Sequence, residues 1–362
     1  MISQKKSVAL PKSVDEYTRR FWFGSLEASW KGQRVAAHWE ACRLNWPYLL
    51  HLAHYHRVLA SFGRAWEGLD GLPEPVKDDV WVAQAMAEQR GQAAVVGIED
   101  LKDAARKRSL RLVLIKSASY LLDAFAGFGD REMLDVDALA LPQDIDVLTQ
   151  ELCQRGYESH DLRRQRVFTR EATTIEVHLE AINRRRFWRL LPPQELLARA
   201  EVDDRWAPLQ RLSTADEAVL LALHAYHHHY RQAIWLRDLA AWWRVRRPDP
   251  GELLDAFRQA NARRIGWTAW RGIERMGWEM PRSWQPQIWG VTPAFDRLVG
   301  WYWDRHAIQA GTSPGSVLRR RWLEFRGAEG AVAKFLACAP WFAPRSVHEL
   351  YDAWKHVEKV PE

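Results

Sequence analysis

Three acidic residues near the middle of the 362-residue chain have types and spacing suited to metal-dependent chemistry. Asp135 and Asp137 are two apart in a strand-like run, Leu134–Leu141, so both side chains are expected on one face, ~7 Å apart along the strand. Glu176 lies in another such run, Thr173–Leu179, which we expect to be an adjacent strand, and a carboxylate there is costly to bury unless a cation or partner meets it. Carboxylates arranged in this way can hold Mg²⁺ or Mn²⁺ together with substrate phosphates. The pattern predicts Asp135, Asp137 and Glu176 as catalytic residues and metal ligands.

A second Asp-x-Asp pair, Asp144 and Asp146, competes with this assignment. It follows Pro142 directly and opens a helix-like segment, where acidic residues interact favourably with the helix dipole. On a helix, positions two apart diverge by ~200°. The sequence therefore favours Asp135 and Asp137 as the metal-binding pair.

Basic and hydroxyl side chains flank the acidic pair. Lys116 and Arg131 can bind phosphate oxygens, or they can simply neutralise the carboxylates. Ser117 and Ser119 can donate to phosphate, or they can cap a helix. We predict all four as substrate-binding residues.

Histidines supply a further group of candidates. His178 is two residues from Glu176, so it shares a strand face and can orient the carboxylate, contact substrate or remain a core histidine. His224 and His228 are four apart and share a helical face. This spacing can bind zinc, but Ala225 stands where a metalloprotease helix has glutamate. We predict that both, with Asp238, line a nucleotide or acceptor pocket; packing is the alternative.

These residues fall in a segment whose patterns switch between strand and helix. Leu110–Ile115 is a short branched apolar run typical of a buried strand, and Ser117–Phe125 has a helical pattern. The remaining expected elements are strands at Leu134–Leu141, Arg166–Thr169 and Thr173–Leu179, and a helix at Gln143–Arg155 that ends at Gly156. This order predicts an α+β fold with a small mixed sheet.

Helical patterns flank this segment on both sides. Trp39–Ala60 and Val80–Ile98 have apolar residues at helical spacing, with a turn at Gly68–Pro75 between them. Later helices are expected at Ala215–Tyr230, Ile234–Arg246, Glu252–Ala262, Gly266–Met276 and Pro293–Ala307. We predict an N-terminal helical region at 1–105, a core at 106–205 and a C-terminal helical domain at 206–362.

Composition excludes several classes of protein. No apolar run approaches the ~18 residues that cross a bilayer, and no apolar segment follows the basic start, so a cytoplasmic protein without membrane contact is expected. Three sparse cysteines, Cys42, Cys153 and Cys338, fit a reducing compartment. Most of the 21 tryptophans lie in helical stretches, where packing between helices is expected. His51, His54 and His56 are interpreted as structural or surface residues.

The net charge of +6 suits phosphate-bearing ligands. The basic residues are not segregated, and no RNA-binding module is present, so nucleic acid is not the expected partner. The runs Arg184–Arg186 and Arg319–Arg321 are interpreted as solvated loops.

An ordered series of motifs resembles a known family. Lys116 precedes small residues, Arg131 stands four residues before Asp135-x-Asp137, a helix ends at Gly156-Tyr157, and Glu176-x-His178 lies on a later strand. Further on come a histidine-containing helix at Ala222–His228 and an aspartate in Trp235–Ala240. The series resembles the uncharacterised nucleotidyltransferases of the DNA-polymerase-β-like superfamily, over roughly residues 110–245.

The resemblance implies a polymerase-β-like sheet and Mg²⁺-dependent transfer from a nucleoside triphosphate, with Asp135, Asp137 and Glu176 as ligands. It also implies that the loop after the first strand holds the triphosphate. The family has glycine after the lysine, whereas this chain has Ser117, which changes how closely the backbone can approach phosphate.

Two hypotheses follow from these observations. The first is a nucleotidyltransferase with an unknown acceptor (a small molecule, sugar, peptide or protein) in natural-product or polysaccharide biosynthesis. The alternative, which Ser117 favours, is a catalytically inactive nucleotide-binding or regulatory protein that keeps the fold. An RNA acceptor is a weaker third hypothesis.

Overall fold

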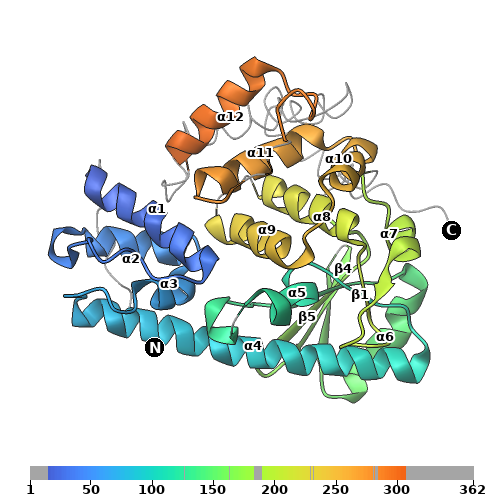
Figure 1. Cartoon of the computed structure of the whole chain (residues 1–362). Coiled ribbons are helices and arrows are strands. Elements are labelled where there is room, and N and C mark those ends of the chain that lie inside the picture. Colours follow the sequence, from blue (N-terminus) through green and yellow to red (C-terminus); the bar gives the residue numbers. More distant parts are fainter. Residues whose placement is uncertain are drawn as a thin grey trace, which may run out of the picture.

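The structure is a computed structural model that describes residues 15–125, 127–162, 164–182, 190–228, 230, 232–279, 281 and 284–306. Within these ranges a mixed sheet is surrounded by helices, so the α+β fold class predicted from the sequence is confirmed (Figure 1). The two arginine runs, Arg184–Arg186 and Arg319–Arg321, and Cys338 lie outside the described residues.

The sheet has seven strands in the order β3-β4-β5-β2-β1-β7-β6. β2 pairs in parallel with β5 and antiparallel with β1, and β1 pairs in parallel with β7. The remaining pairs, β3–β4, β4–β5 and β6–β7, are antiparallel. The strands are β1 (Val113–Leu114), β2 (Val136–Leu139), β3 (Glu158–Leu162), β4 (Gln165–Arg170), β5 (Thr173–His178), β6 (Glu201–Val202) and β7 (Gln210–Arg211).

Three of these strands, β3, β6 and β7, were not predicted from the sequence. β3 is exposed along its whole length and is polar, so it has no apolar alternation, and β6 and β7 have two residues each. The expected helix at Trp39–Ala60 is also wrong as one element, because it is divided into η1 (Ala41–Arg43), α2 (Trp46–Tyr55) and α3 (Leu59–Trp66). Asn45 caps the start of α2, and Arg57 takes a positive φ of 57° between α2 and α3.

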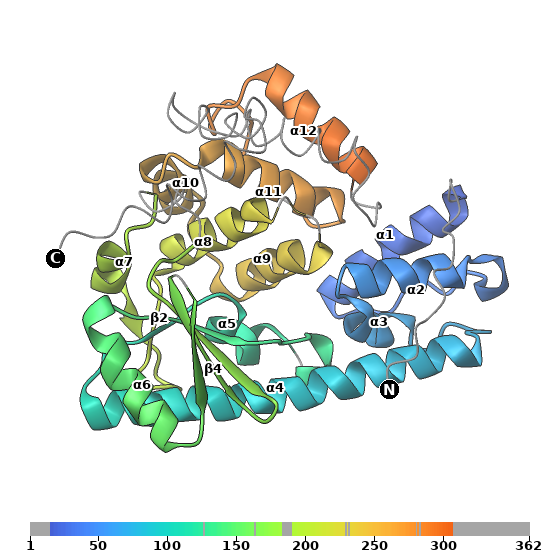
Figure 2. The same ribbon diagram turned by 180° about the vertical axis from the view of Figure 1, so that it is seen from behind.

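The 35-residue helix α4 (Glu74–Arg108) extends from beneath α1 (Glu16–Lys31) and α3 to one face of the sheet (Figures 1 and 2). Ile98 and Leu101 of α4 are buried against the sheet together with α6 (Ile145–Gln154). At Gly97 a Cβ atom would stand 3.0 Å from Thr173 and 3.3 Å from Val136 and Ile175. The helix backbone therefore lies directly against β2 and β5.

The helices from the two ends of the described chain share one hydrophobic core. It contains Trp22, Phe62 and Trp66 from α1 and α3, and Trp242 and Trp270 from the later helices. Those helices are α7 (Pro193–Arg199), α8 (Thr214–His227), α9 (Ala233–Arg246), α10 (Pro250–Gln259), α11 (Arg263–Arg275) and α12 (Pro293–His306). The division of the chain at 105 and 205 stays a prediction. No helix in the described ranges combines the length and apolar character needed to cross a membrane.

His56 connects the end of α2 to the start of α9. Its Nδ1 accepts a hydrogen bond from the Ala233 N–H at 3.1 Å, and its carbonyl accepts from Ile234 at 3.3 Å. The side chain of Gln232 donates to the Tyr55 carbonyl at 2.9 Å. The two contacts of His56 satisfy backbone N–H groups at the start of α9 that have no partner within the helix.

We predict that Gly91→Ala destabilises the fold, although replacing glycine by alanine in a helix interior normally increases the stability by ~1 kcal/mol. A Cβ at Gly91 would stand 2.4 Å from the Cβ of Phe128, in the 3₁₀ helix η2 (Phe128–Asp130), so that η2 must shift. We expect a loss of ~1–3 kcal/mol in urea unfolding. Gly300→Ala in α12 is the control, because nothing lies within 4 Å of its Cβ position. Equal effects of the two changes would contradict close packing at Gly91.

A second prediction concerns pH. Burial, and secondarily the charge of His51, lowers the pKa of His56 to about 3. Below pH ~6.5 the unfolded chain therefore binds a proton at His56 that the folded chain does not bind. The contribution of His56 to the free energy of unfolding is complete above pH ~6.5 and is lost as the pH falls. His56→Asn keeps an acceptor oxygen but does not titrate. Between pH 8 and pH 5, urea unfolding should show the wild type losing ~2 kcal/mol more than the variant. If the difference in unfolding free energy between the wild type and His56→Asn is the same at pH 8 and pH 5, His56 is not buried in its neutral form.

Candidate active site

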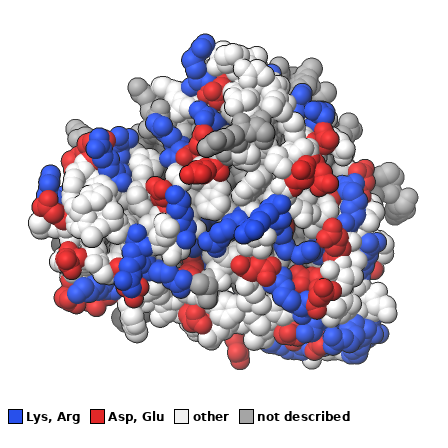
Figure 3. Space-filling model, in the orientation of Figure 1, with Lys and Arg blue, Asp and Glu red and all other residues white. Residues whose placement is uncertain are grey.

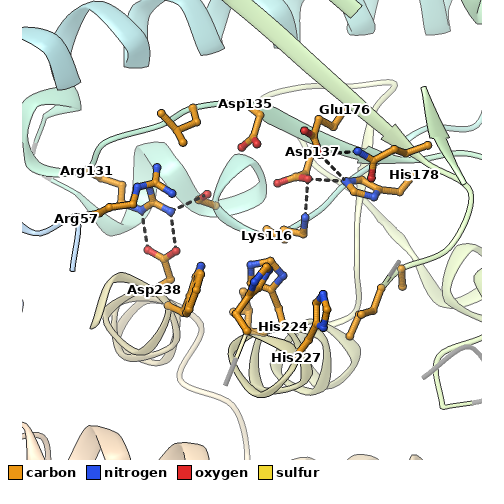
Figure 4. Close-up of a pocket in the computed structure, with 18 residues that line it drawn as sticks. Arg57, Lys116, Arg131, Asp135, Asp137, Glu176, His178, His224, His227 and Asp238 are labelled. Carbon is orange, nitrogen blue, oxygen red and sulfur yellow. Dashed lines mark hydrogen bonds and ion pairs between the residues drawn. The ribbon is translucent and has the colours of Figure 1, made fainter. Parts of the chain in front are cut away.

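A cavity of about 340 Å³ lies between the sheet and helices α8 and α9 (Figure 4). In Figure 4 Asp135, Asp137 and Glu176 lie on the sheet side of the cavity, and His224, His227 and Asp238 project from helices on the opposite side. The cavity brings together every site residue predicted from the sequence except Ser119: Asp135, Asp137, Glu176, Lys116, Ser117, Arg131, His178, His224, His228 and Asp238.

The pairing of β2 with β5 sets the position of the acidic residues. In the parallel register Val136 is opposite Ile175, and Asp137 is opposite Glu176. Because side chains alternate along a strand, Val136 and Ile175 face α4, and the two acidic residues face the cavity. Glu176 is therefore on the strand next to Asp137, as the sequence predicted.

Asp135 differs in one detail from the expectation. It was expected on the same strand as Asp137, but β2 begins at Val136, so Asp135 precedes the strand by one residue. It still lines the cavity. Among the described residues, the closest group of possible metal ligands is Asp137, Glu176 and His178, whose ligand atoms lie within 4.8 Å of one another.

The three carboxylates have different electrostatic environments. Burial, together with the neighbouring carboxylates, raises the pKa of Asp135 to about 6 and that of Glu176 to about 7. Burial also acts to raise the pKa of Asp137, but Lys116 and His178 outweigh it and hold this pKa below its usual value. The site therefore keeps one firmly ionised carboxylate and resists ionisation of the other two, a balance that a cation would change.

Lys116 supplies the positive charge nearest to Asp137. Its Nζ lies 2.6 Å from Asp137 Oδ1 and its side chain is 15% exposed. The residue precedes α5 (Ser117–Ala124) and has a φ of 56°, a left-handed conformation that non-glycine residues seldom adopt. The turn between β1 and α5 thus directs the ammonium group into the cavity.

His178 fixes the orientation of Asp137. Its Nε2 lies 2.6 Å from Asp137 Oδ1 and 3.7 Å from Glu176 Oε2. Burial, and then Lys116, lowers the pKa of His178, so the ring is neutral near pH 7, and the short contact to a carboxylate assigns its single proton to Nε2. Nδ1 has no hydrogen-bond partner among the described residues.

Arg131 forms a buried ion pair across the cavity. Its Nε and Nη2 atoms each donate to a carboxylate oxygen of Asp238 at 2.7 Å, and both side chains are 8% exposed. Nη2 also lies 3.4 Å from the Ser117 hydroxyl. This bidentate pair joins the segment before β2 to α9.

Ser119 lies outside the cavity. Its hydroxyl is hydrogen-bonded to the Lys116 carbonyl at 2.8 Å and to the buried carboxyl group of Glu217. Trp242 donates to the other oxygen of Glu217 at 2.7 Å. Ser119 therefore connects α5 to α8 and does not face the predicted substrate.

The helical wall of the cavity is rich in aromatic rings. The His228 ring stacks on Trp235, with centroids 4.5 Å apart and an angle of 21°, and His224 lies 4.7 Å from His228. Burial lowers the pKa of His224 well below its usual value, and Lys116 and His228 add to the shift. His228 was expected inside the helix but follows its last residue, His227.

Several lining residues were not predicted from the sequence. Gln165, on the neighbouring strand β4, donates a hydrogen bond of 3.3 Å to the Glu176 carboxylate. Arg57 reaches the cavity from the turn between α2 and α3. Trp235 and His227 also line the cavity. Gln165 is opposite His178 in the strand register, so only a correct pairing would have identified it, and no local pattern marks Arg57.

Asp144 and Asp146 lie outside the cavity, as the sequence favoured. Asp144 ends the 3₁₀ helix η3 (Pro142–Asp144), and Asp146 is in the first turn of α6. The Asp146 side chain is 90% exposed and lies 3.3 Å from Arg166.

The family model for uncharacterised nucleotidyltransferases matches residues 43–276. The chain belongs to this family. The matched range begins before α2 and ends after α11, so it includes both walls of the cavity and confirms the resemblance found in the sequence. No curated protein and no solved structure matches this nucleotidyltransferase-family chain.

We predict strong coupling between Arg131 and Asp238. Arg131→Met or Asp238→Asn alone leaves a charged group buried without its partner, and each should cost ~3–5 kcal/mol in urea unfolding. The double variant should cost at least ~2 kcal/mol less than the sum of the two. The exposed pair Arg20–Glu16, whose side chains are 72% and 53% exposed, is the control and should show coupling below ~0.5 kcal/mol. Additive costs for Arg131 and Asp238 would show that the ion pair does not stabilise the fold.

Proposed function

We propose that this protein transfers a nucleotidyl or phosphoryl group from a nucleoside triphosphate to an acceptor, in a reaction that depends on Mg²⁺. One observation carries the proposal: carboxylates from two adjacent parallel strands meet in a cavity that also contains Lys116 and Arg131. Membership of the nucleotidyltransferase family supports it.

Asp135, Asp137 and Glu176 are the proposed metal ligands. The donor set suits a hard divalent cation, because carboxylate oxygens of Asp137 and Glu176 lie within 4.8 Å of each other and Asp135 lines the same cavity. Mg²⁺ or Mn²⁺ bound there would neutralise phosphate charge and orient the triphosphate. His178 acts on the site through its hydrogen bond to Asp137, which holds the carboxylate in one orientation.

Lys116 and Arg131 are the proposed phosphate-binding residues, with the hydroxyl of Ser117 between them. In the structure each cation is paired with a carboxylate, Lys116 with Asp137 and Arg131 with Asp238. The ammonium group on its flexible stem can leave Asp137 for a phosphate oxygen, whereas the bidentate Arg131 is held in place. Arg131 would then contribute charge without moving.

Glu176 is the proposed base for the acceptor hydroxyl. Its side chain is 25% exposed, against 7% for Asp137, so an acceptor can approach it. The wall formed by His224, His228 and Trp235 would bind the nucleoside or the acceptor, and aromatic rings there suit a flat or apolar group. We propose a small molecule, sugar, peptide or protein acceptor, in natural-product or polysaccharide biosynthesis.

The second candidate is a catalytically inactive nucleotide-binding or regulatory protein. Ser117 replaces the family glycine, and its side chain is buried beside Arg131. A backbone carrying this side chain is less free to approach a triphosphate. The two candidates differ in turnover, not in binding.

We predict that one nucleoside triphosphate binds only with Mg²⁺ present. Calorimetric titration with each triphosphate, with and without Mg²⁺, should show binding that Asp135→Ala/Asp137→Ala abolishes. The matched control is Asp144→Ala/Asp146→Ala, which removes the same two charges outside the cavity and should bind as the wild type does. If the intact protein binds no triphosphate in the presence of Mg²⁺, both the catalytic and the nucleotide-binding candidates are wrong.

Turnover separates the two candidates. The triphosphate so identified is labelled at its α-phosphate in one reaction and at its γ-phosphate in another, which follow nucleotidyl and phosphoryl transfer respectively. Transfer of either label to a cell fraction, lost in the Glu176→Gln variant, supports the enzyme. Binding without transfer to any fraction supports the regulatory protein.

A further inference from the structure

A second cavity, of about 60 Å³, opens beside α9 and shares no lining residue with the first. It lies where the C-terminal ends of α1 and α5 meet α3 and α9, and it is lined by Arg64, Arg237 and Arg244 together with Asp130. Pockets for drug-sized ligands are ~300–1,000 Å³, so this space suits one small group.

Arg237 is the unusual residue in this cavity. It is 4% exposed, and in the described part of the chain no hydrogen bond or ion pair satisfies its guanidinium group. Within the described ranges its Nε is buried and has no hydrogen-bond partner, and its guanidinium Cζ lies 4.7 Å from the centroid of the Phe125 ring, a cation–π contact. Burial lowers the pKa of Arg237 to about 10, which still leaves it charged near neutral pH. The carboxylates of Asp238 and Asp130 act in the opposite direction and raise this pKa. A buried, charged arginine without a hydrogen-bond acceptor is costly, and an anionic ligand would supply the acceptor.

The other two arginines and the two hydroxyl groups of the cavity already have partners. Arg64 lies 3.2 Å from Asp130, and Arg244 donates to the Trp30 carbonyl at 3.0 Å and to the Ala124 carbonyl. The hydroxyls of Ser29 and Ser61 donate to backbone carbonyls. Arg237 is therefore the buried charged group with donors to offer a ligand, and the side-chain amide of Gln33 also lines the cavity.

We propose that this cavity binds a phosphate group on Arg237. Three arginines and one aspartate give the cavity a net charge of +2, which matches the charge of about −1.5 to −2 on a phosphate group at pH 7. The planar guanidinium donates two parallel hydrogen bonds to phosphate oxygens. Lys and Arg side chains also form a band across the middle of the face shown in Figure 3, over α9 as seen in Figure 1, and this band favours the approach of an anion.

The site adjoins the first cavity through one helix. Arg237 lines the second cavity, and the next residue, Asp238, lines the first, where it holds Arg131. An anion bound at Arg237 would therefore bind to the same turn of α9 that positions Arg131.

Thermal unfolding in inorganic phosphate, without Mg²⁺ and at constant ionic strength, tests this site. We expect 10 mM phosphate to raise the Tm of the wild type by about 2 °C or more relative to acetate. Arg237→Met should lose this shift and should unfold no earlier than the wild type in phosphate-free buffer, because it removes a buried charge whose Nε has no hydrogen-bond acceptor among the described residues. Arg20→Met, an exposed change, should keep the shift. Lys116→Ala should also keep it, which separates this site from the first cavity.

Glycerol 3-phosphate distinguishes the source of the phosphate group. A larger Arg237-dependent shift than with inorganic phosphate identifies a phosphorylated ligand, and an equal or smaller one identifies free phosphate. Arg64→Ala, which removes an exposed charge of the same cavity, should weaken the shift and provides a second variant if Arg237→Met fails to fold. No phosphate shift in the wild type, an equal shift in acetate, or a full shift in Arg237→Met would overturn the proposal.

Discussion

The parallel pairing of β2 with β5 places two carboxylates side by side on the buried face of a sheet, and the surrounding structure has to compensate for that charge. Asp137 and Glu176 are opposite each other in the register, with Asp135 one residue before β2. Like charges in a poorly solvated space repel, so burial and mutual repulsion raise the pKa of two of them. Lys116 and His178 both contact the remaining one, Asp137.

The pairing of β2 with β5 also depends on close packing of α4 against the face of the sheet opposite the cavity. Val136 and Ile175, one residue from the acidic pair, face α4, whose backbone comes closest at Gly97. A larger residue there would push α4 away from the strands that carry the site. The position of the carboxylates is thus maintained by a contact on the opposite face of the sheet, where packing density leaves little freedom.

The second wall of the cavity depends on helices brought together from both ends of the described chain. His56 binds the start of α9, the tryptophan-rich core joins α1 and α3 to α8 and α9, and Arg131 reaches Asp238 across 107 residues of sequence. α9 consequently carries Trp235 and Asp238 into the first cavity and Arg237 into the second. The proposed nucleotide site and the proposed phosphate site therefore both include charged residues of α9.

The sequence by itself determined the features that depend on local geometry. Alternation along Leu134–Leu141 and Thr173–Leu179 put the acidic residues on one face of each strand, and the helical pitch separated the side chains of Asp144 and Asp146. Only the tertiary structure decided which strands pair, that Ser119 turns to Glu217, and that Arg57 and Gln165 join the cavity. It also decided that the Nε of Arg237 is buried with no hydrogen-bond partner among the described residues. The reason is physical: the side-chain direction follows from the neighbouring backbone, whereas burial and partners follow from contacts between residues far apart in the sequence.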